Sequence, residues 1–103
     1  MAAIKITEAN AWVGAASILA FVAEQLQASG RFQRLQQSFD AIEAGWQYLD
    51  LSGLNPTERD DLKIIVSRIV AEVKKGGPDA FGGPAHFPGF LARLQELEGL
   101  VTS

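Results

Sequence analysis

The sequence contains no cysteine, so a disulfide framework, a thiolate nucleophile and a cysteine metal site are all excluded. It also lacks a long apolar run. The most apolar stretch, Ala9 to Ala23, lies between Glu8 and Glu24 and falls short of the roughly 20 apolar residues that a bilayer span needs. The first six residues make a poor signal peptide, because no uninterrupted apolar run follows their single lysine. These absences favour a cytoplasmic protein.

Basic residues are fewer than acidic residues in this sequence. The chain has 9 Lys and Arg residues against 12 Asp and Glu residues, which gives a formal net charge of -3. Nucleic-acid-binding proteins usually carry a basic stripe that neutralises several phosphates, and an anionic membrane repels an acidic surface. We therefore expect neither a nucleic acid nor a membrane to be the partner.

Groups suited to catalysis are few, and His86 is the only histidine. A catalytic imidazole needs a nucleophile, an orienting acid or further metal ligands, and no Glu-x-x-His pair or hydrolase-type serine turn occurs. The chain also has neither of the common glycine-rich phosphate-binding motifs. The sequence therefore predicts a protein that is not an enzyme and has no catalytic residue, metal or cofactor.

What the chain does have is an ordinary globular composition. Its 103 residues are 48% hydrophobic and 20% charged, which suits one cooperative domain spanning residues 1–103. The sequence shows no internal repeat and no linker between domains. Alternation typical of a strand is confined to Ala3 to Thr7, which is too little for a sheet.

Apolar residues at spacings of three and four predict two helices in the first half of the chain. The first helix is expected from Thr7 to Ser29, with Gly30 after its end. The second is expected from Arg31 to Leu51. Its narrow apolar stripe consists of Phe32, Leu35, Phe39, Ile42, Trp46 and Leu49.

The third helix has the clearest start signal, because Asn55 can cap it, Pro56 suits the first helical position and Glu58 completes the pattern. Gly76 begins a segment that is rich in glycine and proline and runs to residue 89, where we expect a long loop. The last helix should begin at Pro88 or Gly89 and end near Leu100. The predicted fold is all-α, a four-helix bundle or an irregular helical bundle with this long loop before the last helix.

Two groups of residues are candidates for binding a partner. Aromatic side chains on a preorganised loop are typical contacts at interfaces, although they can also pack onto the bundle. Acidic residues on the second helix can steer a basic partner or simply keep the protein soluble. The loop candidates are Asp79, Phe81, His86 and Phe87, and the acidic candidates are Asp40, Glu43 and Asp50.

The leading hypothesis is a non-catalytic domain that binds another protein. Small acidic helical chains without cysteine resemble bacterial immunity proteins in size and composition, although the sequence carries no family motif. The resemblance implies an inhibitor that occludes a basic toxin or enzyme, with acidic residues speeding the encounter and aromatic residues holding the complex.

Two alternatives stay open. The stripe of the second helix suits a self-associating assembly or scaffold protein, such as a homodimer. A pocket between the helices suits a small ligand, for which the best polar groups are Trp12, Trp46, Tyr48 and His86.

Overall fold

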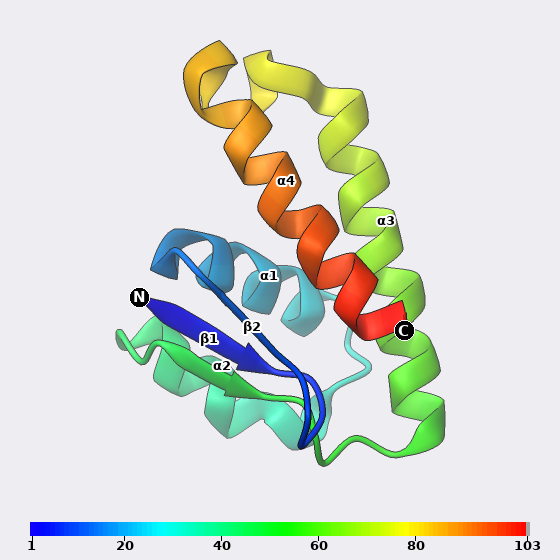
Figure 1. Ribbon diagram of the computed structural model, residues 1–103. Coiled ribbons are helices and arrows are strands. Elements are labelled where there is room, and N and C mark those ends of the chain that lie inside the picture. The colour runs from blue at the N-terminus through cyan, green and yellow to red at the C-terminus, as the bar shows by residue number, and fades with distance from the viewer. Residues whose placement is uncertain (103) are drawn as a thin grey trace.

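The computed structural model describes residues 1–102 and is mostly helical, but it also contains a three-stranded sheet (Figure 1). The prediction of an all-α bundle was therefore wrong. In chain order the elements are β1 (Ala2–Lys5), β2 (Ala11–Gly14), α1 (Ala16–Ala28), the short 3-10 helix η1 (Gln33–Leu35), α2 (Gln36–Glu43), β3 (Tyr48–Asp50), α3 (Pro56–Ala80) and α4 (Gly83–Thr102).

The first strand lies in the middle of the sheet, whose order is β2-β1-β3. β1 pairs antiparallel with β2, so that Ile4 lies opposite Trp12. On its other side β1 pairs parallel with β3, and Ile4 lies beside Leu49. Parallel strands need a long crossover connection, which β2, α1 and α2 provide here.

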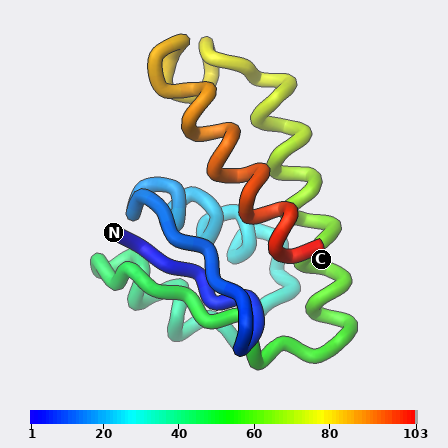
Figure 2. Tube along the Cα trace, in the orientation of Figure 1, coloured from blue at the N-terminus to red at the C-terminus, as the bar shows by residue number. Residues whose placement is uncertain are grey.

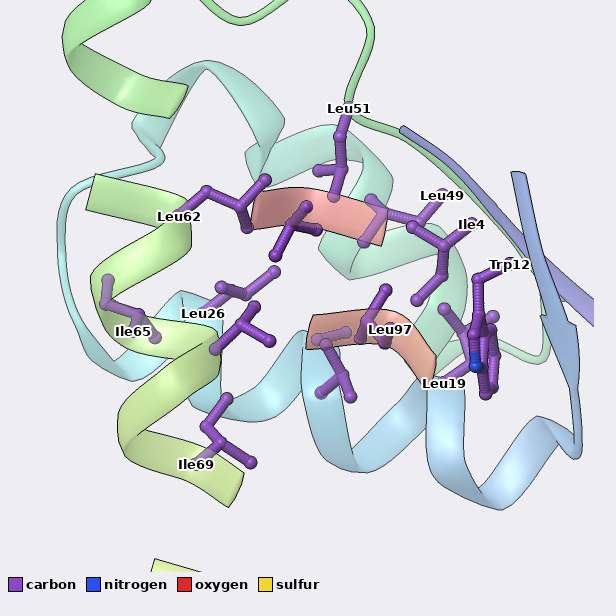
Figure 3. Close-up of a cluster of buried hydrophobic side chains, with 14 of the residues drawn as sticks. Ile4, Trp12, Leu19, Leu26, Leu49, Leu51, Leu62, Ile65, Ile69 and Leu97 are labelled. Atoms are coloured by element: carbon purple, nitrogen blue, oxygen red, sulfur yellow. The ribbon is translucent and has the colours of Figure 1, made fainter. Parts of the chain in front are cut away.

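The two faces of the sheet differ in burial. Ile4, Trp12 and Leu49 are at most 1% exposed and face the helices. Figure 3 shows them with Leu19 of α1 and Leu97 of α4 in one apolar cluster. Because side chains alternate along a strand, the residues between them form the outer face.

Helix–helix packing is concentrated in the hairpin formed by α3 and α4. The two helices lie side by side, and their connected end projects beyond the sheet (Figure 2). The other end of the hairpin packs on the sheet, where the indole Nε1 of Trp12 donates a hydrogen bond of 3.0 Å to the backbone oxygen of Arg93. This bond joins β2 to the last helix.

The predicted second helix was wrong in its second half. α2 ends at Glu43, and Gly45 then adopts a φ of 110°, a conformation that only glycine adopts easily. The helical spacing of apolar residues is therefore shared by three separate elements, η1, α2 and β3. Trp46, which the pattern assigned to a buried stripe, is 61% exposed.

The predicted first helix began too early, because residues 11–14 form β2 and α1 begins at Ala16. In this extended segment the aromatic side chain of Trp12 is buried, with 1% of its surface exposed. It folds over Gly14, where an added Cβ would lie 2.5 Å from Cη2 of Trp12. The apolar and small residues of this segment thus serve a sheet rather than a central helix.

The start of α3 is confirmed. The side chain of Asn55 accepts a bond of 2.8 Å from the backbone N–H of Glu58, whose carboxylate accepts one of 3.0 Å from the N–H of Asn55. This reciprocal arrangement satisfies two N–H groups that the helix leaves free. Pro56 occupies the first helical position, where a missing N–H has no cost.

The long loop predicted over residues 76–89 was also wrong. α3 kinks at Gly77, which has a φ of 68°, and continues to Ala80, and α4 already begins at Gly83. Pro78 and Pro84 each follow a glycine of positive φ, so each lies in a first turn where proline is tolerated. Only a tight turn remains between the two helices.

Candidate functional site

The seven residues predicted to bind a partner lie on two separate surfaces at opposite ends of the molecule (Figure 1). The group at the projecting end of the hairpin comprises Asp79, Phe81, His86 and Phe87. The group on α2 and β3 comprises Asp40, Glu43 and Asp50. The structure therefore does not combine them into one site.

The hairpin end contains a pocket of about 560 Å³, which we call the hairpin pocket. Phe81 and His86 line it, whereas Phe87 packs against the core and Asp79 is exposed. The pocket lies between the start of α1, the turn after α3 and the first half of α4. Its lining residues are Ser17, Ile18, Phe81, Gly82, His86, Gly89, Phe90 and Arg93.

Phe81 and Phe90 give this pocket its apolar character, and Phe21 packs against both of them. The rings of Phe81 and Phe90 are stacked with centroids 5.9 Å apart, and Phe21 meets Phe90 edge-on at 5.5 Å. All three are partly buried against the core. Aromatic pairs of this geometry stabilise a structure beyond the area they bury, so the rings form a preorganised surface.

Two polar side chains of α4 border this aromatic surface. His86 and Arg93 are seven residues apart on α4, so they lie on one face of it about 10 Å apart along the axis. Arg93 Nη1 pairs with Glu96 at 3.0 Å, and both side chains are about half exposed. An exposed ion pair of this kind contributes little free energy, so another anion can compete with Glu96 for the guanidinium.

A second surface lies at the open edge of the sheet. We call Trp46, Tyr48 and Asp50 the β3 edge surface, because they lie in or just before the edge strand β3, whereas Glu43 lines a pocket between α1 and α2. Trp46 is 61% exposed and Tyr48 is 39% exposed. Val13 of β2, which is 47% exposed, occupies the same row of the outer face as Tyr48.

The backbone of β3 is paired on one side only. The N–H of Ala3 donates to the oxygen of Gln47 at 3.0 Å, and the N–H of Leu51 donates to the oxygen of Lys5 at 2.8 Å. Alternate residues of a strand point their N–H and C=O groups to opposite sides. Those of Tyr48 and Asp50 therefore point away from β1, to the side where residues 1–102 provide no further strand.

The carboxylate of Asp50 is held in its charged form. It accepts bonds from the hydroxyl of Ser52 at 2.6 Å and from the Ser52 N–H at 2.9 Å, which lower its pKa. The pKa of Lys5 is raised, first by its hydrogen bond to Glu8 and less by the charge of Asp50. Asp50 therefore keeps its negative charge to a lower pH than an ordinary aspartate does.

Sequence reasoning missed how these groups are distributed. Trp12, Trp46, Tyr48 and His86 were expected to line one ligand pocket, but they do not converge. Trp12 is buried, Trp46 and Tyr48 lie at the sheet edge, and His86 lines the hairpin pocket. Arg93 was not singled out, although its spacing of seven from His86 could have indicated a shared helix face.

Across residues 1–102, no set of three or more histidine, aspartate or glutamate side chains is placed to hold a metal ion. Within the same part of the chain, no polar or charged residue is fully buried. None of its helices combines the length and apolarity needed to cross a membrane.

No protein-family model, curated protein or solved structure matches this chain.

Proposed function

We propose that this chain is a non-catalytic, cytoplasmic protein-binding domain whose β3 edge surface receives an extended, basic segment of another protein. The observation that carries the proposal is the pair of exposed aromatic residues, Trp46 and Tyr48, beside an unpaired strand edge. The finer form of the proposal is an inhibitor or immunity-type protein that covers a basic toxin or enzyme.

The backbone of β3 supports this mode of binding. An extended peptide can add a strand to an exposed sheet edge, where main-chain hydrogen bonds provide affinity and alternate side chains provide specificity. The outward N–H and C=O groups of Tyr48 and Asp50 provide four such positions. Natural proteins usually protect such edges, so an open one beside aromatic residues favours a binding role.

The exposed aromatic residues support the same mode. Trp and Tyr are enriched among the residues that dominate binding energy at interfaces. Trp46 follows the glycine turn at Gly45, and its N–H donates to the oxygen of Ala41 at 2.9 Å, which fixes the backbone that carries the indole. A fixed backbone lowers the entropy lost on binding.

The charges favour a basic partner. Asp50 belongs to the β3 edge surface, and Asp40 and Glu43 lie on α2, the helix that precedes β3 in the chain. The nearest lysine, Lys5, is already paired with Glu8 at 3.0 Å. Complementary charge chiefly accelerates encounter and selects the partner, as an inhibitor of a basic active site requires.

The scaffold alternative loses the feature that motivated it. Phe32, Leu35, Phe39 and Leu49 of the predicted stripe are buried in the chain's own core. They are therefore not available to a second helix. Self-association is left with the open edge of β3, where a second copy would compete with the partner.

The first test is affinity capture from the parent cell with three forms of the protein: wild type, Trp46→Ala and the control Ile64→Ala. Ile64 is 57% exposed on α3, so its replacement removes a similarly exposed apolar side chain elsewhere. We expect wild type and Ile64→Ala to return one stoichiometric basic protein that Trp46→Ala does not retain. Equal retention by all three forms, or return of a homo-oligomer alone, contradicts the proposal.

The second test separates backbone pairing from the loss of a ring. Tyr48→Pro and Tyr48→Ala both remove the phenol, but only the proline variant also removes the outward N–H. An edge strand tolerates proline at a position whose N–H faces solvent. We expect Tyr48→Pro to weaken binding of the captured protein about tenfold more than Tyr48→Ala, the effect of one hydrogen bond. Equal affinities would exclude strand addition.

A further inference from the structure

We propose that the hairpin pocket is a separate binding site for a small aromatic carboxylate, a molecule with a flat apolar ring and one carboxylate group. This site is remote from the β3 edge surface and is independent of the function proposed above. Its features are the stacked phenylalanines, the side chains of His86 and Arg93 on α4, and the space left by a glycine.

The size and lining of the pocket set the apolar part of the ligand. A volume of about 560 Å³ lies within the range of small-molecule sites, which are mostly apolar with a few polar groups. Phe81, Phe90 and Ile18 provide the apolar wall. A flat ring can stack on Phe90 or meet its edge, as Phe21 and Phe81 already do.

The charges of the lining set the polar part. Arg93 is cationic, His86 supplies a ring N–H, and the eight lining residues include no carboxylate. Glu96 accepts from Nη1 of Arg93, at 3.0 and 3.4 Å, and no bond from the other guanidinium nitrogens is found among residues 1–102. Nε and Nη2 of the guanidinium are thus available, and a guanidinium binds a carboxylate with two parallel bonds.

Space inside the pocket comes from Gly89. A Cβ built at this position meets no atom within 4 Å, although Gly89 lies in α4 where alanine would be more stable. Gly99 of the same helix is equally open but does not line the pocket. The two glycines therefore form a matched pair for testing whether the pocket is used.

The first experiment measures binding of two probes, indole-3-acetate and its neutral analogue indole-3-acetamide, by calorimetry. We expect the carboxylate to bind about tenfold more tightly, as one charge-assisted hydrogen bond implies. Arg93→Gln should remove this preference while keeping the backbone oxygen that binds Trp12. The control Arg68→Gln, at an exposed arginine of α3, should keep it.

The second experiment fills the pocket. Gly89→Leu should abolish binding of indole-3-acetate without lowering the melting temperature, whereas Gly99→Leu should leave binding unchanged. Binding that survives Gly89→Leu, equal affinity for the acid and the amide, or no binding of either probe overturns the proposal. Tighter binding of a peptide that ends in a phenylalanine carboxylate would assign the pocket to a protein terminus instead. Trp46→Ala should not affect any of these results, so failure here is distinct from failure at the β3 edge surface.

Discussion

The contact between Trp12 and Gly14 provides the sharpest test of how the sheet is held to the last helix. A Cβ on Gly14 would lie 2.5 Å from Cη2 and 2.6 Å from Cζ2 of Trp12. Trp12 is 1% exposed, and its Nε1 is bound to Arg93 O at 3.0 Å, so the ring cannot move without losing that bond. We therefore predict that Gly14→Ala destabilises the protein.

Three contributions determine how much Gly14→Ala lowers the free energy of unfolding. Overpacking of a core costs about 1–3 kcal/mol, and loss of one hydrogen bond costs about 1 kcal/mol. Replacing glycine with alanine offsets at most about 1 kcal/mol of this loss, because it lowers the conformational entropy of the unfolded chain. The net loss in the free energy of unfolding should be about 2 kcal/mol, which moves the urea midpoint down by about 1–2 M.

The assay is urea unfolding followed by far-ultraviolet circular dichroism. Gly53→Ala is the control, because a Cβ there meets nothing within 4 Å, and it should be neutral or stabilising. Trp12→Phe removes the outer part of the indole, so Gly14→Ala should cost at least about 1 kcal/mol less in that background. A neutral Gly14→Ala, or costs that add within about 0.5 kcal/mol, would refute the reasoning.

Three further outcomes are expected. Gly99→Ala should raise the free energy of unfolding by about 0.5–1 kcal/mol, because the position is helical and open, and thermal unfolding measures it. Asn55→Ala should lower it by about 1 kcal/mol in urea titrations, because the first turn of α3 loses its cap. Asp50 has a lowered pKa in the folded state, so its stabilising contribution is present above about pH 4 and is lost as the pH falls through the folded pKa. Ser52→Ala should reduce this loss of stability in acid, as urea titrations at several pH values would show, and an unchanged pH dependence would contradict the assignment.

Local signals in the sequence predicted the parts of the fold that depend on local chemistry. Asn55, Pro56 and Glu58 are sufficient to start α3, because a cap and its helix are neighbours in sequence. The sheet depends on distant partners instead. β3 has only three residues, and it is a strand because β1, more than forty residues earlier, lies beside it. Periodicity cannot reveal such a pairing.

The candidate site was predictable to a similar extent. Phe81 and His86 were expected to be functional because prolines and glycines surround them, and both line the hairpin pocket. The long loop on which they were expected to lie is absent from the described residues, and they lie in and beside helices instead. Their role in binding stays a prediction. Trp46 was misassigned because a glycine at position 45 can continue a helix or form a turn, and the sequence does not say which. In the structure Gly45 adopts a positive φ and ends the helical course of the chain.

The central position of β1 has a consequence for synthesis of the chain. β1 cannot pair with its parallel neighbour β3 until residues 48–50 have left the ribosome. The hydrogen bond from Trp12 forms later still, because its acceptor, the backbone oxygen of Arg93, lies 81 residues downstream. Such distant contacts slow folding, and an apolar strand that is left unpaired in the meantime is prone to aggregate. We therefore expect folding to be completed only after α4 has left the ribosome, with shorter fragments dependent on chaperones.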